Sequence, residues 1–195
     1  MLTVALLLFT ARVRAQEPVS NLARGPVFGI KTNLLYDATS TINLGVEFRL
    51  SKVLTLDVPV NYNPWTFSDN AKMKHLLVQP ELRYWLYEPF NGPFFGVHAI
   101  GSLFNAGGDV TGASSIIKGM KDYRYQGWTT GVGVSYGYQW MLSNRFSLEA
   151  TAGLGVLYLE YNKYDCEKCG RKITKESQYY VGPTKLGLSL VWMLW

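Results

Sequence analysis

Charged and apolar side chains alternate with a period of two along most of this chain. From 41 to 50 the sequence reads TINLGVEFRL, in which alternate residues from Ile42 to Leu50 are apolar and Glu47 and Arg49 fall on the other phase. Because successive side chains of a strand point to opposite faces, this pattern indicates strands that lie between an apolar and a polar medium. About eight such segments occur, which predicts an all-β fold, an eight-stranded antiparallel up-and-down transmembrane β-barrel of the outer-membrane type.

The eight expected strands can be placed from this alternation. They run approximately over Phe28–Tyr36, Thr41–Leu50, Leu54–Tyr62, Leu76–Leu86, Phe95–Leu103, Gly127–Trp140, Arg145–Tyr158 and Tyr180–Trp195. Pro59 and Pro80 fall inside two of them, and proline cannot donate a ladder hydrogen bond. We therefore expect a β-bulge at each of these prolines.

The links between the expected strands alternate in length. The short ones are Ser51-Lys52, Glu88–Pro93 and Leu142–Asn144, and the long ones are Asn63–Met73, Asn105–Tyr125 and Tyr161–Tyr179. Outer-membrane barrels have short periplasmic turns and longer extracellular loops. The pattern therefore predicts an outer-membrane location, with both termini in the periplasm and the long loops outside the cell.

Two classes of barrel share this alternation, and they differ in which face holds the charges. A soluble ligand-binding barrel places its charges outside, whereas a narrow membrane barrel keeps small and polar residues in its crowded lumen. Here glycine shares the charged phase, and the bulky aliphatic residues share a phase with Trp and Tyr near the strand ends, as in the aromatic girdles of membrane barrels. The residues that fit such girdles are Tyr36, Tyr62, Trp65, Tyr84, Trp128, Tyr138, Trp140, Tyr158 and Trp192. We therefore expect the membrane class and keep a soluble exported ligand-binding barrel as an alternative.

The N-terminal sequence MLTVALLLFTARVRAQ is typical of a secretory signal, with a short apolar core followed by small residues at Val13 and Ala15. We expect residues 1–15 to form a signal peptide, 16–25 a periplasmic segment and 26–195 the transmembrane barrel. Loss of Arg12 and Arg14 with the signal leaves 17 basic against 14 acidic residues, a net charge of +3 instead of +5. This small surplus does not favour nucleic acid as a partner.

Nine charged residues lie on the phase expected to face the lumen. They are Lys31, Glu47, Arg49, Asp57, Glu81, Arg83, Arg145, Glu149 and Lys185. Charges removed from water must be paired, so we expect a network of ion pairs that fixes the strand register and closes the lumen. A narrow channel or transport path through the same polar lumen is the alternative.

The remaining motifs do not predict catalysis, a metal site or a cofactor. Cys166 and Cys169 form a single C-x-x-C, whereas a structural zinc site needs four ligands, so we expect a local loop disulfide in an exported protein. His98 lies on the lumen phase, where it is expected to be hydrogen-bonded, and His75 follows a long loop at the rim. No serine, histidine and acid fall in a recognisable catalytic context, and we expect no enzyme.

Several segments together resemble an uncharacterised outer-membrane β-barrel family of Bacteroidota, similar in layout to the OmpA/OmpX-type barrels. They are KTNLLYD (31–37), PVNYNPW (59–65), QPELRYW (79–85), GPFFGVH (92–98), CEKCG (166–170) and YVGPTK (180–185). Members of that family often lie near genes for fimbrillin-type pili, so the resemblance implies fimbrial or other surface proteins as partners. It also implies contact with outer-membrane lipid and lipopolysaccharide, and with the barrel-assembly machinery, which reads an aromatic C-terminus such as Trp195. We therefore expect a structural or surface-interaction role, associated with fimbriae or envelope integrity.

Overall fold

The computed structural model describes residues 25–66, 72–107, 123–164 and 172–195, and these segments are almost entirely β-structure. In chain order the elements are β1 (Phe28–Asn33), α1 (Leu34–Ala38), β2 (Ile42–Arg49), β3 (Leu54–Asn63), β4 (Lys72–Val78), β5 (Glu81–Trp85), β6 (Gly92–Gly107), β7 (Arg124–Met141), β8 (Phe146–Tyr164) and β9 (Lys172–Leu194). The expected signal peptide and all but the last residue of the expected 16–25 segment lie outside the described residues, as do Cys166 and Cys169. Within the described chain, no helix has both the length and the apolar character needed to cross a membrane.

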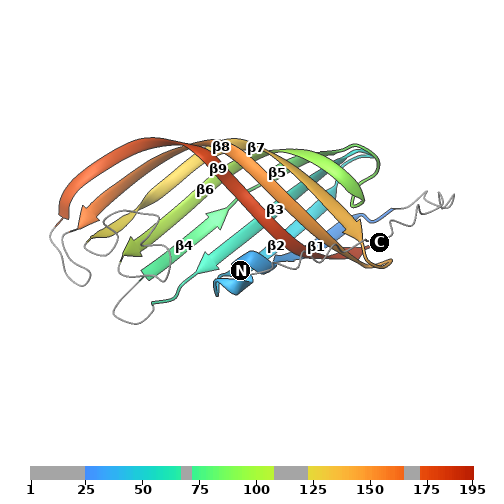
Figure 1. The fold of residues 1–195 in the computed structure, drawn as a ribbon, viewed down its shortest axis with the longest axis horizontal. Coiled ribbons are helices and arrows are strands. Elements are labelled where there is room, and N and C mark those ends of the chain that lie inside the picture. Colours follow the sequence, from blue (N-terminus) through green and yellow to red (C-terminus); the bar gives the residue numbers. More distant parts are fainter. Residues whose placement is uncertain (1–24, 67–71, 108–122, 165–171) are drawn as a thin grey trace, which may run out of the picture.

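The strands form a closed antiparallel barrel (Figure 1). Apart from β4 and β5, which do not pair with each other, each strand pairs with its neighbour in the chain, and β9 returns to pair with β1, where Phe28 lies opposite Leu194. β4 and β5 both lie between β3 and β6, with the same register on each side, so they are two halves of one strand position. The barrel therefore has eight strand positions, which confirms the predicted eight-stranded antiparallel fold.

Neither internal proline produces a bulge, and the prediction of bulges was wrong. Pro59 lies directly opposite Gly45 in an unshifted β2–β3 ladder. Pro80 separates β4 from β5 without changing the register on either neighbour. The carbonyl groups of both prolines still accept hydrogen bonds. Pro59 O accepts from Gln79 N at 3.2 Å, and Pro80 O accepts from Ala99 N at 3.0 Å. Each proline therefore costs the ladder one amide donor while the chain stays extended.

The first strand is shorter than the alternation predicts, because Leu34–Ala38 forms the short helix α1. Asn33 caps this helix, and its side chain accepts a hydrogen bond from Leu35 N at 3.1 Å. Such a cap satisfies an otherwise unpaired amide and favours a helical turn over continued strand. Leu34 and Tyr36 are therefore not outward residues of a strand, and Tyr36 instead lines the lumen.

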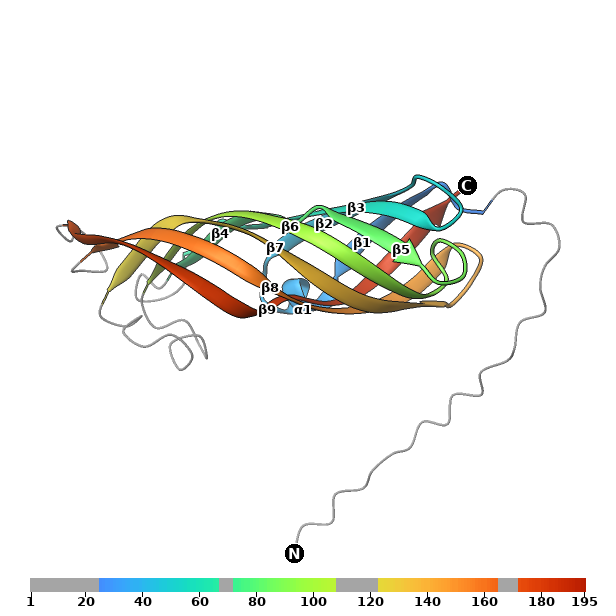
Figure 2. The same ribbon diagram turned by 90° about the horizontal axis from the view of Figure 1, so that it is seen from above.

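The last four strands are unusually long, with 16, 18, 19 and 23 residues in β6 to β9. The expected third long link therefore contains strand: β8 continues to Tyr164 and β9 begins at Lys172, not near Tyr180. Figure 2 shows these strands extending past β1 to β3 at one end of the barrel. We call this the distal end, and the opposite end, which carries the short turns and the C-terminus, the turn end.

In the middle of the barrel, side chains segregate by face. The described interior holds charged and polar groups such as Glu81 and Arg83, both with no exposed surface. The exterior is apolar, with Val132 and Val134 each 62% exposed and Leu186 67% exposed. This distribution is the reverse of that in a water-soluble barrel.

Candidate functional site

A cluster of buried charged groups occupies the middle of the lumen, and Arg83 lies at its centre. The guanidinium makes five hydrogen bonds to four carboxylates, which equals its number of N–H donors. Its Nε donates to Glu81 (2.7 Å), Nη1 to Glu47 and Glu149 (2.8 Å each), and Nη2 to Asp57 (2.8 Å) and Glu149 (3.0 Å). These acids come from β2, β3, β5 and β8, so one side chain connects strands across the whole barrel.

Two lysines complete the ionic part of the cluster. Lys31 on β1 approaches Glu47 at 2.6 Å, Glu149 at 3.1 Å and Asp57 at 3.2 Å. Lys185 on β9 lies 2.9 Å from Glu81. Three cations face four carboxylates in this cluster, so its formal charge is −1 with neutral histidine.

Hydroxyl groups satisfy most of the remaining carboxylate oxygens. Thr55 donates to Glu47 at 2.5 Å, Thr151 donates to Glu149 at 3.1 Å, and Ser135 donates to Glu81. Glycine makes room for the last of these bonds, because a Cβ on Gly96 would collide with Ser135 and Glu81. Buried charges that are paired and hydrogen-bonded in this way avoid the large penalty of an unpaired ion.

A β-bulge directs two neighbouring side chains into the lumen. The β8–β9 register shifts between Gly153 and Leu154, which leaves Thr184 as the extra residue of β9. A bulge breaks the alternation of side chains, so Thr184 and Lys185 both point inward. Thr184 Oγ1 lies 3.0 Å from His98 Nε2, while Lys185 reaches Glu81.

An apolar layer closes the lumen between the charged cluster and the turn end. It consists of Trp85, Phe90, Phe94, Val191 and Met193, all at most 1% exposed. The two layers are in contact, since Trp85 Nε1 donates to Thr55 at 2.9 Å and the Arg83 guanidinium lies 4.3 Å from the centre of the Phe94 ring.

Phe90 enters this layer from a turn with an unusual backbone. Its φ of +67° is rare for a bulky residue and costs roughly 1–3 kcal/mol. Its side chain is 1% exposed and packs with Val191 and Met193, which offsets that cost.

Little space remains on the distal side of the cluster. The void there measures about 30 Å³, and Tyr36, Asn61, Gln79 and Lys31 are among the residues that line it. A volume of this size holds about one water molecule. Within the described chain, the lumen is therefore blocked by charged groups in the middle and by aromatic rings at the turn end.

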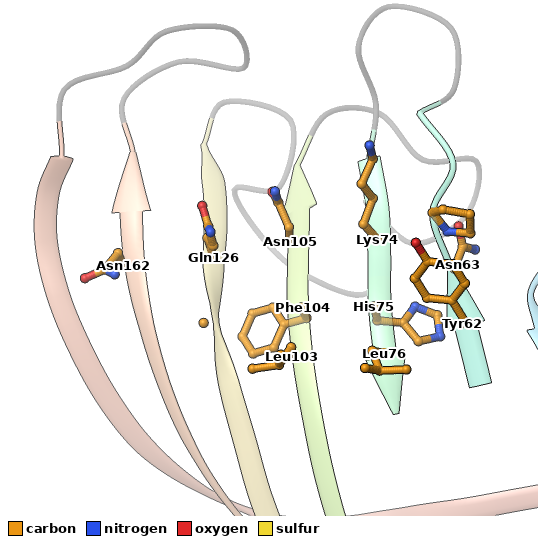
Figure 3. Close-up of a pocket in the computed structure, with 12 residues that line it drawn as sticks. Tyr62, Asn63, Lys74, His75, Leu76, Leu103, Phe104, Asn105, Gln126 and Asn162 are labelled. Carbon is orange, nitrogen blue, oxygen red and sulfur yellow. The ribbon is translucent and has the colours of Figure 1, made fainter. Parts of the chain in front are cut away.

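The structure brings together seven of the nine charged residues that the sequence places on the lumen phase. Arg49 and Arg145 are not part of the cluster. Arg49 is half-buried at the turn end and donates to Ser51 O at 3.0 Å, and Arg145 is exposed beside the turn before β8. His98 is buried in the lumen, and His75 lies at the distal rim (Figure 3). Among the described residues, no group of three His, Cys, Asp or Glu side chains is placed to hold a metal ion.

Sequence reasoning missed the apolar layer and the hydroxyl donors. Trp85 and Phe94 share the lumen phase with Arg83 and Gly96, and a bulky residue on that phase was the available signal. Val191 and Met193 carried the same signal in the last strand. Thr184 could not be found in this way, because nothing in the local sequence marks the bulge.

The chain matches a known protein family over almost its whole length. A family model described as "Protein of unknown function (DUF3575)" matches residues 1–194. The chain belongs to the DUF3575 family. No curated protein and no solved structure matches this DUF3575 member. Its function is therefore inferred from the geometry of the barrel.

Proposed function

We propose that this DUF3575 protein is a small outer-membrane β-barrel with a closed lumen and a non-catalytic, structural or surface-interaction role. The observation that carries the proposal is the reversed polarity of the barrel. Glu47, Glu81 and Arg83 have no exposed surface, whereas large aliphatic and aromatic side chains cover the outside. Exposed apolar surface of this extent is costly in water and favourable against lipid.

The height of the apolar belt supports this proposal. On β7 it extends from Trp128 to Trp140, with Val132 and Val134 between them. These twelve residue steps, at about 3.4 Å each and a tilt of about 45°, cover about 29 Å along the membrane normal. The outward apolar band of known membrane barrels is about 25 Å tall, so the belt fits one bilayer.

Aromatic side chains at both limits of the belt support the same placement. Tyr62, Trp128 and Tyr158 lie toward the distal end, and Trp140 and Trp192 lie toward the turn end. Membrane barrels carry such girdles at both interfaces. We expect the turn end to face the periplasm and the long strands β6 to β9 to project outside the cell.

The blocked lumen favours a structural role over a channel. A void of about 30 Å³, with charges on one side and Trp85, Phe90 and Phe94 on the other, supports no continuous path for ions. The projecting strands offer a surface for a partner, and the sequence resemblance makes fimbrial or other surface proteins the first to test. Lipid, lipopolysaccharide and the barrel-assembly machinery are the partners that membrane insertion requires.

The test measures both the insertion of the protein into a membrane and its ion conductance there. Purified protein refolded into vesicles is expected to migrate differently on cold and boiled SDS gels, and to give no sizeable pore in planar bilayers. A matched variant, Phe90→Ala with Phe94→Ala, opens the apolar layer and is expected to leave the ionic layer blocking the lumen. Steady large conductance of the unaltered protein would refute the closed lumen, and folding in buffer without detergent would instead support the soluble barrel.

A further inference from the structure

A row of polar side chains crosses the outer wall just above the apolar belt. Cross-strand register places Lys74 opposite Asn105, Asn105 opposite Gln126, and Gln126 opposite Asn162. One Lys and three amides therefore lie side by side across β4, β6, β7 and β8. Figure 3 shows Lys74 and Asn105 above Leu76 and Leu103, which begin the apolar belt.

The wall is hollowed in two places along this boundary. The lining of an upper hollow of about 600 Å³ includes the polar row, Leu76 and Leu103, and it extends to Tyr62 and His75. A lower hollow of about 370 Å³ also includes Leu76 and Leu103 and contains Gly101. The same two leucines line both hollows, so the two spaces adjoin.

Gly101 keeps the lower hollow open. A Cβ built on this exposed glycine meets no other atom within 4 Å, so neither backbone geometry nor crowding requires glycine here. Leu103 and Trp128 form the walls beside it. The result is an apolar slot between these two side chains.

The upper hollow carries positive charge. Lys74 lines it, and Arg124 stands one step along the same face, where its Nε donates to Asn105 Oδ1 at 2.8 Å. The guanidinium also lies 6.0 Å from the centre of the Tyr164 ring. Among the described residues that line this hollow there is no carboxylate, and Glu160, one step from Asn162 on the same face, is paired with Lys175 at 2.8 Å. Cations beside amide donors favour an anionic group with several acceptor oxygens.

We propose that these two hollows bind one phosphorylated acyl lipid of the outer leaflet. The inference rests on the proposed membrane location. The phosphate lies against Lys74 and Arg124, with amide groups of the polar row as further donors, and an acyl chain fills the slot at Gly101. A ligand that is anionic at one end and aliphatic at the other matches both hollows, whereas a peptide or a free anion matches only one.

The test measures retention of a defined lipid by the full-length protein in detergent. The probe is lipid A with two phosphates, followed by native mass spectrometry, and the comparison probe is the same lipid without phosphate. Each basic residue near a membrane surface strengthens binding to an anionic lipid. The loss of one such residue is therefore expected to weaken binding about fivefold. Lys74→Gln with Arg124→Gln is therefore expected to weaken binding about 25-fold, and removal of both phosphates to have a similar effect.

Two further variants separate the slot from general effects of charge. Gly101→Leu fills the slot and is expected to weaken binding about tenfold, the equivalent of roughly two buried methylene groups. Lys52→Gln with Arg145→Gln makes the same charge change at the turn end and is expected to leave binding unchanged.

Equal retention of the two lipids by the unaltered protein overturns the inference, and this comparison needs no variant to fold. Unchanged binding by Gly101→Leu, or full competition by inorganic phosphate, would contradict the lipid site. Either result would mean that the two cations bind a simple anion. A protein that fails to insert, shown by identical migration on cold and boiled gels, contradicts the proposed function. A protein that inserts but retains no lipid contradicts only this inference.

Discussion

At the scale of single residues, Arg83 shows how a barrel can hold an ion away from water. All five N–H donors are used, and the acids that receive them are themselves paired with Lys31, Lys185 or nearby hydroxyl groups. A lysine here could not replace these contacts, because its ammonium has three donors and no planar fork. The cluster therefore depends on the shape of arginine as well as on its charge.

Arg83→Met tests this dependence. The substitution keeps much of the side-chain volume but leaves four carboxylates facing only two lysines. Removal of one partner from a buried ion pair costs about 3–5 kcal/mol, so we expect a destabilisation of that size. The measurement is the urea concentration at which the vesicle-inserted barrel loses its heat-modifiable migration.

Arg49→Met and Arg145→Met are the matched controls. Both arginines share the lumen phase of their strands, yet they lie at the turn end outside the cluster. Surface substitutions of this kind usually change stability by at most about 0.5 kcal/mol. An equal effect of all three substitutions would mean that the cluster does not stabilise the barrel.

These three arginines also show a limit of prediction from sequence. Alternation assigns a residue to a face, and it assigned Arg83, Arg49 and Arg145 to the same one. Depth along the strand decides whether that face is buried or open to solvent, and depth follows from stagger between strands. Strand tilt and stagger are properties of the closed barrel, and a single strand does not encode them.

At the scale of elements, the β-bulge at Thr184 in β9 places two neighbouring side chains, Thr184 and Lys185, at the cluster. Thr184 reaches His98, and its carbonyl accepts from Gln79 Nε2 at 3.0 Å. Lys185 reaches Glu81. A regular strand would turn one of these two side chains outward.

Deletion of Thr184 is expected to give a folded barrel. The remaining residues pair in an unbroken register, so Leu186 and Leu188 still face outward. The loss is confined to the hydrogen bonds of Thr184, and an unsatisfied buried partner costs about 1–3 kcal/mol. The measurement is the stability of the folded band on cold gels against urea.

Deletion of Leu188 is the contrasting control. The ladder accommodates it by removing the bulge, which turns Lys185 to the outer face and Leu186 into the lumen. A lysine facing the middle of a bilayer costs about 2–4 kcal/mol, and the cluster also loses a cation. If both deletions fold equally well, the bulge has no role in setting the register.

The strands illustrate what the sequence determines. Alternation predicted the outward faces of β2, β3, β7 and β8 because a face between two media leaves a signal in every second residue. It missed α1, since Leu34 and Tyr36 kept the period although Asn33 caps a helical turn. It also missed the start of β9 at Lys172, where polar residues on both faces leave no alternation to read.

At the scale of the whole molecule, the position of the apolar belt gives a prediction that depends on depth. Val134 lies midway between Trp128 and Trp140 on the outer face. Val134→Arg is therefore expected to cost about 2–4 kcal/mol, as for an arginine at the bilayer midplane. Gln126→Arg, on the same strand at the polar row, is expected to cost about 0–1 kcal/mol.

The comparison is made by equilibrium unfolding in vesicles, with Val134→Leu as a control for the change in volume. Similar costs for both arginine substitutions would contradict the bilayer position. A stabilising effect of Val134→Arg in buffer would favour a soluble protein.

The ionic cluster has a consequence for the order in which this barrel is assembled. Arg83 meets Glu149 across 66 residues of chain, and Lys31 meets the same acid across 118. The hairpins made first therefore carry charges whose partners have not yet arrived. These charges find all their partners only when β8 and β9 close the ring against β1, so barrel closure is expected to be one cooperative step and not to proceed hairpin by hairpin.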